Sequence, residues 1–157
     1  MNSPKRKPII FLAFASVLTP GYIELPGLAH EARALRKTLE HRGCYEVVVR
    51  ENATLDDILD VFGKEEYHGH IAVFHYGGHA ESDFLLLQSD GGKLLPAYAN
   101  GFAAFLAEQP GLRLVFLNAC STAAQVEELL GAGVGAVVAT EKEIPDDLAH
   151  RFAARFY

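Results

Sequence analysis

The sequence has few cysteines, little clustered positive charge and no segment long enough to cross a membrane as a helix. Its 157 residues include only two cysteines, Cys44 and Cys120, too few for a disulfide framework. Lysine and arginine total 14 against 20 aspartates and glutamates, a formal net charge of −6. These shortages argue against a secreted disulfide-rich protein, a nucleic-acid partner and a membrane-spanning chain, and they favour a cytoplasmic protein.

The N-terminus contains one competing signal. Lys5, Arg6 and Lys7 precede an apolar run from Ile9 to Leu18, an order that is also found in signal peptides. Removing this run would delete the first strand of a regular β/α alternation, and no small-x-small cleavage site follows it before Thr19. We therefore interpret the run as a strand.

Short apolar runs alternate with amphipathic segments along the whole chain, with no internal repeat or low-complexity linker. Half of the residues are hydrophobic and 22% are charged, which suits one globular domain with one core. Strands are expected at residues 9–15, 45–49, 71–75, 112–117 and 134–139, with a hairpin at 84–88 and 93–95. Helices are expected between these strands and after Pro145. This alternation predicts an α/β protein, a three-layer α/β/α sandwich with a mostly parallel sheet.

Helix starts and faces can also be predicted from residue spacing. Thr54 with Asp57, and Thr122 with Gln125, have the spacing of capping boxes. In the first helix Glu31 is expected on the polar face, because the apolar positions recur at helical spacing as Leu28, Ala32, Leu35 and Leu39. The apolar positions of the last helix are Leu148, Phe152 and Phe156.

His79, in FHYGGHA, and Cys120, in VFLNACST, each follow a strand that is expected to be buried. The carboxyl ends of parallel strands open onto one crevice, where a thiol and an imidazole can act as nucleophile and base. Cys120 also precedes a helix N-terminus, whose N–H groups favour a thiolate and could bind an oxyanion. Gly77 and Gly78 are expected to let the chain turn and to leave room for a peptide carbonyl.

Other interpretations of these residues remain open. His79 could be a loop histidine, and Cys120 a small apolar residue that closes a strand end. Irregular spacing argues against a zinc site, whose possible ligands are His68, His70, His75, His79 and Cys120. His75 is expected to be a hydrogen-bonded structural histidine and Cys44 a packing or surface residue. Glu81 and Asp83 are equally plausible as the group that orients His79.

Three segments carry a family resemblance: FHYGGHAE, LVFLNACSTAAQVEELLGAGVGAVVAT and DLAHRFAARFY. They resemble the CHAT domain, a branch of the caspase-like cysteine peptidases, and IIFLAFAS and NATLDDILDVF extend the resemblance over nearly the whole chain. It implies a caspase-hemoglobinase-like fold and a peptide-bond hydrolase with His79 as base and Cys120 as nucleophile. By the same resemblance, the amide nitrogens of Ala80 and Cys120 form the oxyanion hole. No metal or organic cofactor is expected.

The resemblance also bears on substrates. Relatives that cleave after a basic residue often have an aspartate two positions before the cysteine, and the neutral Asn118 occupies that position here. Asn118 and Gly78 are candidates for the substrate pocket, but the residue preferred before the cleaved bond stays open.

Many CHAT domains are similar to effector modules of bacterial defence or signalling proteins. The expected partners are therefore a protein or peptide substrate and fused or associated sensor or regulatory domains, without nucleic acid or membrane. Because the sequence stops at Tyr157 without a polar tail, residues 1–157 are expected to be a domain truncated from a longer chain. The alternative function is a catalytically silent caspase-like domain that acts as a protein-interaction module.

Overall fold

The computed structural model describes residues 6–16 and 19–157. The apolar run that imitates a signal peptide extends to Leu18, and both Leu18 and the basic Lys5 lie outside the described residues.

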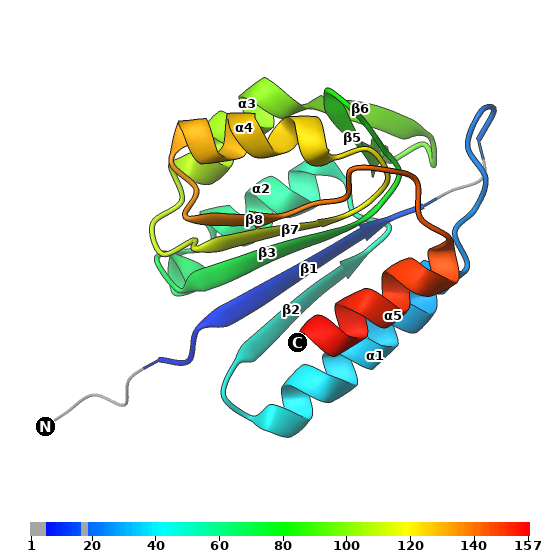
Figure 1. Cartoon of the computed structure of the whole chain (residues 1–157). Coiled ribbons are helices and arrows are strands. Elements are labelled where there is room, and N and C mark those ends of the chain that lie inside the picture. The colour runs from blue at the N-terminus through cyan, green and yellow to red at the C-terminus, as the bar shows by residue number, and fades with distance from the viewer. Residues whose placement is uncertain (1–5, 17–18) are drawn as a thin grey trace, which may run out of the picture.

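A five-stranded parallel sheet forms the centre of the molecule, in the order β2-β1-β3-β7-β8 (Figure 1). Every neighbouring pair in it is parallel. Its strands are β1 (Ile9–Ala15), β2 (Glu46–Glu51), β3 (Ile71–Gly78), β7 (Leu114–Asn118) and β8 (Ala136–Val138). The structure thus confirms the predicted α/β class and the mostly parallel sheet.

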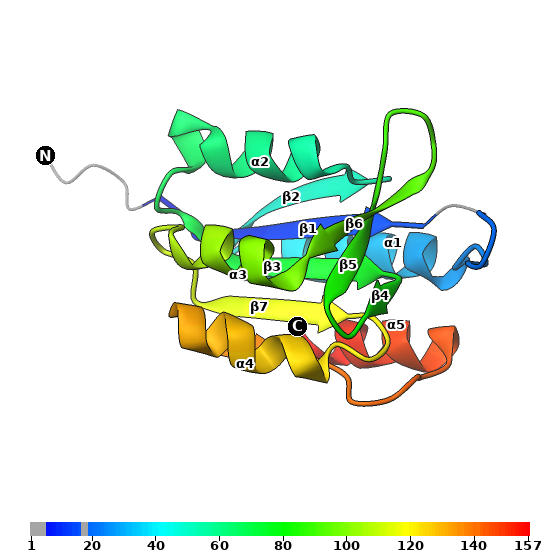
Figure 2. The same ribbon diagram turned by 90° about the horizontal axis from the view of Figure 1, so that it is seen from above.

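Helices cover both faces of this sheet, as the two views in Figures 1 and 2 show. One face carries α1 (Gly27–Arg42) and α5 (Asp146–Phe156), and the other carries α2 (Leu55–Gly63), α3 (Ala99–Ala107) and α4 (Ala123–Ala132). A short 3₁₀ helix, η1 (Glu65–Tyr67), precedes β3. Phe11 of β1 joins the hydrophobic cluster under α2 and α3, whereas Leu12 joins the cluster under α1. Successive side chains of a strand point to opposite faces, so β1 is apolar throughout.

A second, antiparallel sheet follows His79 in the chain. It contains β4 (Ala80–Glu81), β5 (Phe84–Gln88) and β6 (Leu94–Tyr98), in that order. This sheet includes the predicted hairpin, with a longer second strand than expected. Because β4 starts one residue after His79, the sheet continues directly from the end of β3 (Figure 2).

One predicted capping box is confirmed and the other is wrong. The Thr54 hydroxyl accepts a hydrogen bond from the Asp57 N–H, and the Asp57 carboxylate accepts one from the Thr54 N–H, each at 3.0 Å. No side-chain cap is present at Thr122. There the buried Gln125 instead donates its amide to the Glu81 carbonyl at 2.9 Å, because it faces the second sheet rather than its own helix start.

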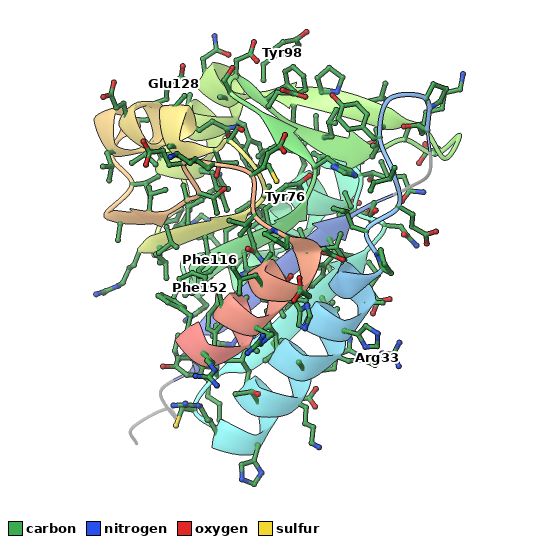
Figure 3. All side chains as sticks on the ribbon, turned by 45° about the vertical axis from the view of Figure 1, so that its right-hand side comes forward. Arg33, Tyr76, Tyr98, Phe116, Glu128 and Phe152 are labelled. Atoms are coloured by element: carbon green, nitrogen blue, oxygen red, sulfur yellow. The ribbon has the colours of Figure 1, made fainter. Side chains whose placement is uncertain are left out.

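The expected polar position of Glu31 is also wrong, since this side chain is only 1% exposed. Glu31 shares the buried side of α1 with Leu28 and Leu35 and bonds to His75 and Asn118 of the sheet. Helix α5 packs along α1 (Figure 3). The small Ala153 is the buried residue of α5, so the two helices can lie close together. The larger apolar side chains of α5 stay about half exposed, although Phe152 contacts Phe116 of the sheet with 5.9 Å between ring centroids.

Candidate functional site

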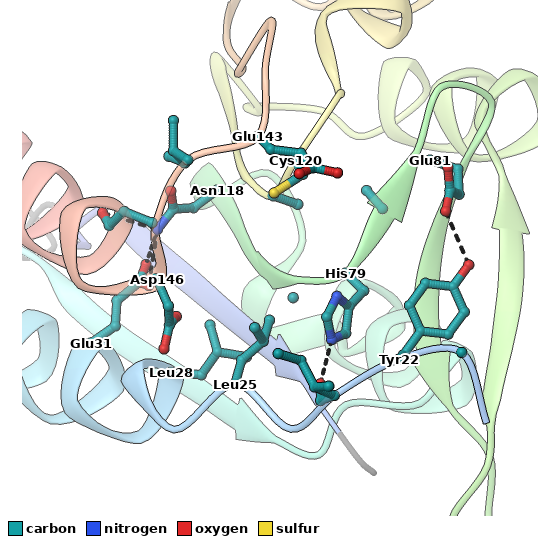
Figure 4. Close-up of a pocket in the computed structure, with 17 residues that line it drawn as sticks. Tyr22, Leu25, Leu28, Glu31, His79, Glu81, Asn118, Cys120, Glu143 and Asp146 are labelled. Carbon is teal, nitrogen blue, oxygen red and sulfur yellow. Dashed lines mark hydrogen bonds between the residues drawn. The ribbon is translucent and has the colours of Figure 1, made fainter. Parts of the chain in front are cut away.

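The register between β3 and β7 brings the two predicted catalytic residues to the same edge of the sheet. Gly77 of β3 pairs with Asn118 of β7. His79 and Cys120 each lie two residues beyond this pair, and both line one pocket of about 450 Å³ (Figure 4). The thiol and the imidazole therefore share one cleft at the carboxyl ends of adjacent strands.

Cys120 lies in the short turn between β7 and α4, where it is partly exposed rather than sealed in the core. The next residue, Ser121, has a φ of 56°, in the left-handed region that non-glycine residues rarely adopt. Such a conformation costs about 1–2 kcal/mol, so the surrounding contacts must stabilise it. Residues of this kind concentrate at functional sites.

Thr122 and Thr140 provide those stabilising contacts. The fully buried Thr122 hydroxyl donates to the Ala119 carbonyl at 3.2 Å and accepts from the Thr140 N–H at 3.1 Å. The Thr140 hydroxyl also donates to the Ala119 carbonyl, and the Thr140 carbonyl accepts from the Ala123 N–H at 3.0 Å. Residues before and after Cys120 in this turn are thus hydrogen-bonded to Thr140, in the segment after β8.

A main-chain carbonyl orients His79. Its Nε2 lies 2.6 Å from the Ile23 carbonyl oxygen, between β1 and α1. A carbonyl only accepts, so Nε2 carries the proton and Nδ1 is left as the acceptor. Figure 4 shows that second ring nitrogen on the side facing Cys120. Neither Glu81 nor Asp83, the two carboxylates considered for this role, has a hydrogen bond to His79 among the described residues; the Glu81 carboxylate accepts from the Tyr22 hydroxyl at 3.1 Å.

No residue pattern points to this contact, because any residue type can supply a main-chain oxygen. The aromatic ring of Tyr22 also lies beside His79, with 5.1 Å between ring centroids. Tyr22 and Ile23 belong to a segment for which the sequence predicts only a connection between strand and helix. The loop before α1 therefore forms one wall of the site (Figure 4).

Tyr76 forms a hydrogen bond that holds the main chain at His79 in place. Its buried hydroxyl lies 2.7 Å from the His79 carbonyl and 2.6 Å from the Leu86 carbonyl. Burial raises the pKa of Tyr76 far above its ordinary value, so the phenol stays protonated and donates to this pair of acceptors.

The two glycines before His79 serve packing rather than substrate access. A Cβ at Gly77 would lie 2.7 Å from the Phe14 ring, and one at Gly78 would lie 2.6 Å from the Ala15 carbonyl and closer still to the Tyr76 hydroxyl. The expectation that they leave room for a peptide carbonyl is thus corrected, because the protein's own atoms occupy that space. Gly78 nevertheless lines the pocket, as predicted.

The remaining predicted site residues lie in the same pocket. Ala80 and Asn118 both line it. Asn118 is 4% exposed and donates its amide nitrogen to both Glu31 oxygens, each at 2.9 Å, and to the Ala149 carbonyl at 3.3 Å. Its Oδ1 has no hydrogen-bond partner among the described residues. The structure therefore brings all five predicted site residues together.

His75 stands apart from this chemistry, as predicted. It is completely buried, with Nε2 2.7 Å from Glu31 Oε1 and Nδ1 3.2 Å from the Tyr157 hydroxyl. It therefore links the sheet to α1 and to the residue after α5. Cys44, the other thiol, is exposed.

No hydrogen bond joins the Cys120 sulfur to the His79 ring within the part of the chain that the structure describes. Each side chain reaches the pocket from its own strand end (Figure 4). Distances between catalytic groups are often long without substrate and shorten in the complex. This arrangement suits a substrate carbonyl that is held between the two groups.

A comparison with known protein families identifies the family of this chain. A sequence model of the CHAT domain matches residues 2–157. The chain belongs to the CHAT family. This confirms the resemblance and gives the domain a caspase-like fold. No curated protein matches this CHAT domain in sequence.

Two further observations describe the chain more generally. Across residues 6–16 and 19–157, no group of three or more His, Cys, Asp or Glu side chains is arranged to hold a metal ion. None of the helices in those residues has the length and apolar character that crossing a membrane requires.

Proposed function

We propose that this CHAT domain is a cysteine endopeptidase that cleaves protein substrates, with Cys120 as nucleophile and His79 as base. The observation that carries the proposal is the β3–β7 register, which puts both side chains in one open pocket. The orientation of His79 adds support, because Nε2 donates to the Ile23 carbonyl, so Nδ1 is the nitrogen of the neutral ring that can accept a proton.

The reaction follows from these positions. The Cys120 sulfur attacks the scissile carbonyl carbon, while the thiol proton passes to His79 Nδ1. Main-chain N–H groups of Ala80 and Cys120 stabilise the oxyanion of the tetrahedral intermediate. The C–N bond then breaks, and His79 returns the proton to the leaving amine. Finally His79 removes a proton from water, which attacks the thioester and frees the sulfur.

The resemblance to CHAT effector modules supports a role in a bacterial defence or signalling protein. One observation favours the alternative of a catalytically silent interaction module. Leu148, Phe152 and Phe156 of α5 are each about half exposed, and exposed apolar patches often mark protein-binding surfaces. The two functions differ in one requirement, because only the peptidase needs the Cys120 sulfur.

Alkylation tests the proposed dyad. Iodoacetamide is applied to the full-length protein across a pH series, and each thiol is quantified by mass spectrometry. Cys120 is expected to react below about pH 7, where ordinary thiols are slow, and Cys44 serves as the internal control. His79→Ala should slow the reaction of Cys120, whereas His41→Ala, at an exposed position, should not. Equally slow labelling of both thiols would end the peptidase proposal.

Cleavage itself is tested by mapping new protein N-termini in cells that produce the full-length protein or its Cys120→Ala variant. Cleavage products present only with the unchanged cysteine support an endopeptidase. A partner that is captured equally well by both forms, without cleavage products, supports the interaction module instead.

A further inference from the structure

The pocket has carboxylates on both sides of the dyad, which neither the family assignment nor the dyad explains. Four carboxylate side chains line it, and the described lining residues include no lysine or arginine; the four are Glu31, Glu81, Glu143 and Asp146. Figure 4 shows Asn118, Glu31 and Asp146 on one side of the dyad, with Tyr22 and Glu81 on the other. Carboxylates at these positions attract cations and repel other carboxylates.

On the side of the dyad that Glu31, Asn118 and Asp146 form, the unused hydrogen-bonding groups are all acceptors. Asn118 Oδ1 is buried without a partner among the described residues. The amide cannot be turned round, because its nitrogen faces the Glu31 carboxylate and the Ala149 carbonyl, and both of these accept. Asp146 Oδ2 accepts from the Gly27 N–H at 2.7 Å, while its Oδ1 has no hydrogen bond to any described residue.

Resting on the proposed peptidase function, we infer that this pocket selects arginine or lysine as the residue before the cleaved bond. Both side chains carry only donors and a positive charge, so they match unpaired acceptors beside carboxylates. An acidic side chain would be repelled, and an apolar one would offer no donor to these acceptors.

The neutral Asn118 does not exclude such a substrate. The negative charge comes instead from Glu31 of α1 and Asp146 of α5, which the fold brings to Asn118 from 87 and 28 positions away along the sequence. Asn118 itself contributes an acceptor rather than a charge.

The test uses peptidyl chloromethyl ketones that differ only in the residue next to the reactive group: Arg, Lys, Gln, Leu or Asp. The rate of Cys120 alkylation in the full-length protein is measured by mass spectrometry, so no turnover is needed. The Arg or Lys reagent is expected to react at least about 10-fold faster than the Gln and Leu reagents, and the Asp reagent slowest.

Asp146→Asn tests the carboxylate with little change of shape. Its amide oxygen can still accept from the Gly27 N–H, so the α1 contact persists while the charge is lost. This variant should reduce the rate with the Arg reagent by about 10- to 100-fold and leave the Gln reagent unchanged. The control is Asp147→Asn, at the next and exposed position outside the pocket, which should change neither rate.

The outcomes separate this inference from the proposed function. Fast, His79-dependent alkylation with a Leu, Gln or Asp preference would overturn the inference and keep the peptidase. No alkylation by any reagent, together with slow iodoacetamide labelling, would overturn both. If Asp146→Asn does not fold, the wild-type order of rates decides the matter alone.

Discussion

The buried Glu31 carboxylate should be among the strongest single contributors to stability in this domain. It accepts from His75 Nε2 at 2.7 Å and from the Asn118 amide at 2.9 Å, and all three side chains are at least 96% buried. Glu31→Ala would leave His75 Nε2 without an acceptor and the Asn118 amide with only the Ala149 carbonyl, at 3.3 Å. Leaving a buried donor unsatisfied costs about 1–3 kcal/mol, so the loss of the contacts to both donors should cost about 2–6 kcal/mol. That is a large part of the total free energy of unfolding of a domain, about 5–15 kcal/mol.

Chemical denaturation followed by circular dichroism measures this cost. Glu40→Ala is the matched control, because Glu40 lies on the same helix with its side chain exposed, and it should change the unfolding free energy by no more than about 0.5 kcal/mol. Glu31→Gln keeps the volume and one acceptor but points an amide N–H₂ group at existing donors. Its cost should lie between the two, at about 1–3 kcal/mol.

Two results would refute this reasoning. A cost of Glu31→Ala equal to that of Glu40→Ala would show that the carboxylate does not satisfy His75 and Asn118. A Glu31→Gln protein as stable as wild type would show that the acceptor pattern around this position does not matter.

Three further substitutions test the contacts that position the site, each by chemical denaturation. Tyr76→Phe removes a buried donor and should cost about 1–3 kcal/mol, whereas Tyr98→Phe, at an exposed tyrosine, should be nearly neutral. Thr122→Val removes both hydroxyl contacts of the turn that carries Cys120, so it should cost about 1–3 kcal/mol and slow alkylation of Cys120. Unchanged stability and an unchanged alkylation rate would count against a supporting role of Thr122. Gly77→Ala would overpack against Phe14 and destabilise the protein by about 1–3 kcal/mol. Gly101→Ala, in open space on a helix, should stabilise it by about 0.5–1 kcal/mol. A change of the unfolding free energy in the same direction for both variants would contradict the packing account.

The sheet and the dyad could be predicted because each depends on local sequence. Strands β1, β3 and β7 are buried on both faces, so they appear as apolar runs that need no partner to be recognised. His79 and Cys120 follow the ends of two such runs, and the rule that parallel strands end at one edge is enough to place them together.

The groups that support the dyad could not be predicted, because they depend on contacts between distant segments. Glu31 lies three residues after Leu28 and four before Leu35, on the buried face of α1, but its charge suggested exposure; its partners, His75 and Asn118, come from distant strands of the sheet. Thr122 and Gln125 have the spacing of a capping box, yet their side chains bond equally well to other segments, and here they do so. The Ile23 carbonyl carries no side-chain signature at all.

The side of the pocket that Glu31, Asn118 and Asp146 form exists only when α1, β7 and α5 are packed together. Asp146 at the start of α5 accepts from Gly27 at the start of α1, and Asn118 at the end of β7 donates to α1 and to α5. These contacts join residues up to 119 positions apart, so the pocket has no counterpart in the unfolded chain. The contacts that dock α5 onto α1 also place Asp146 and Asn118 in the lining of one pocket. Under the proposed specificity, substitutions that loosen the α1–α5 contact should weaken discrimination among substrates even where His79 and Cys120 are untouched, because Glu31 and Asp146 come from α1 and α5, whereas His79 and Cys120 follow β3 and β7.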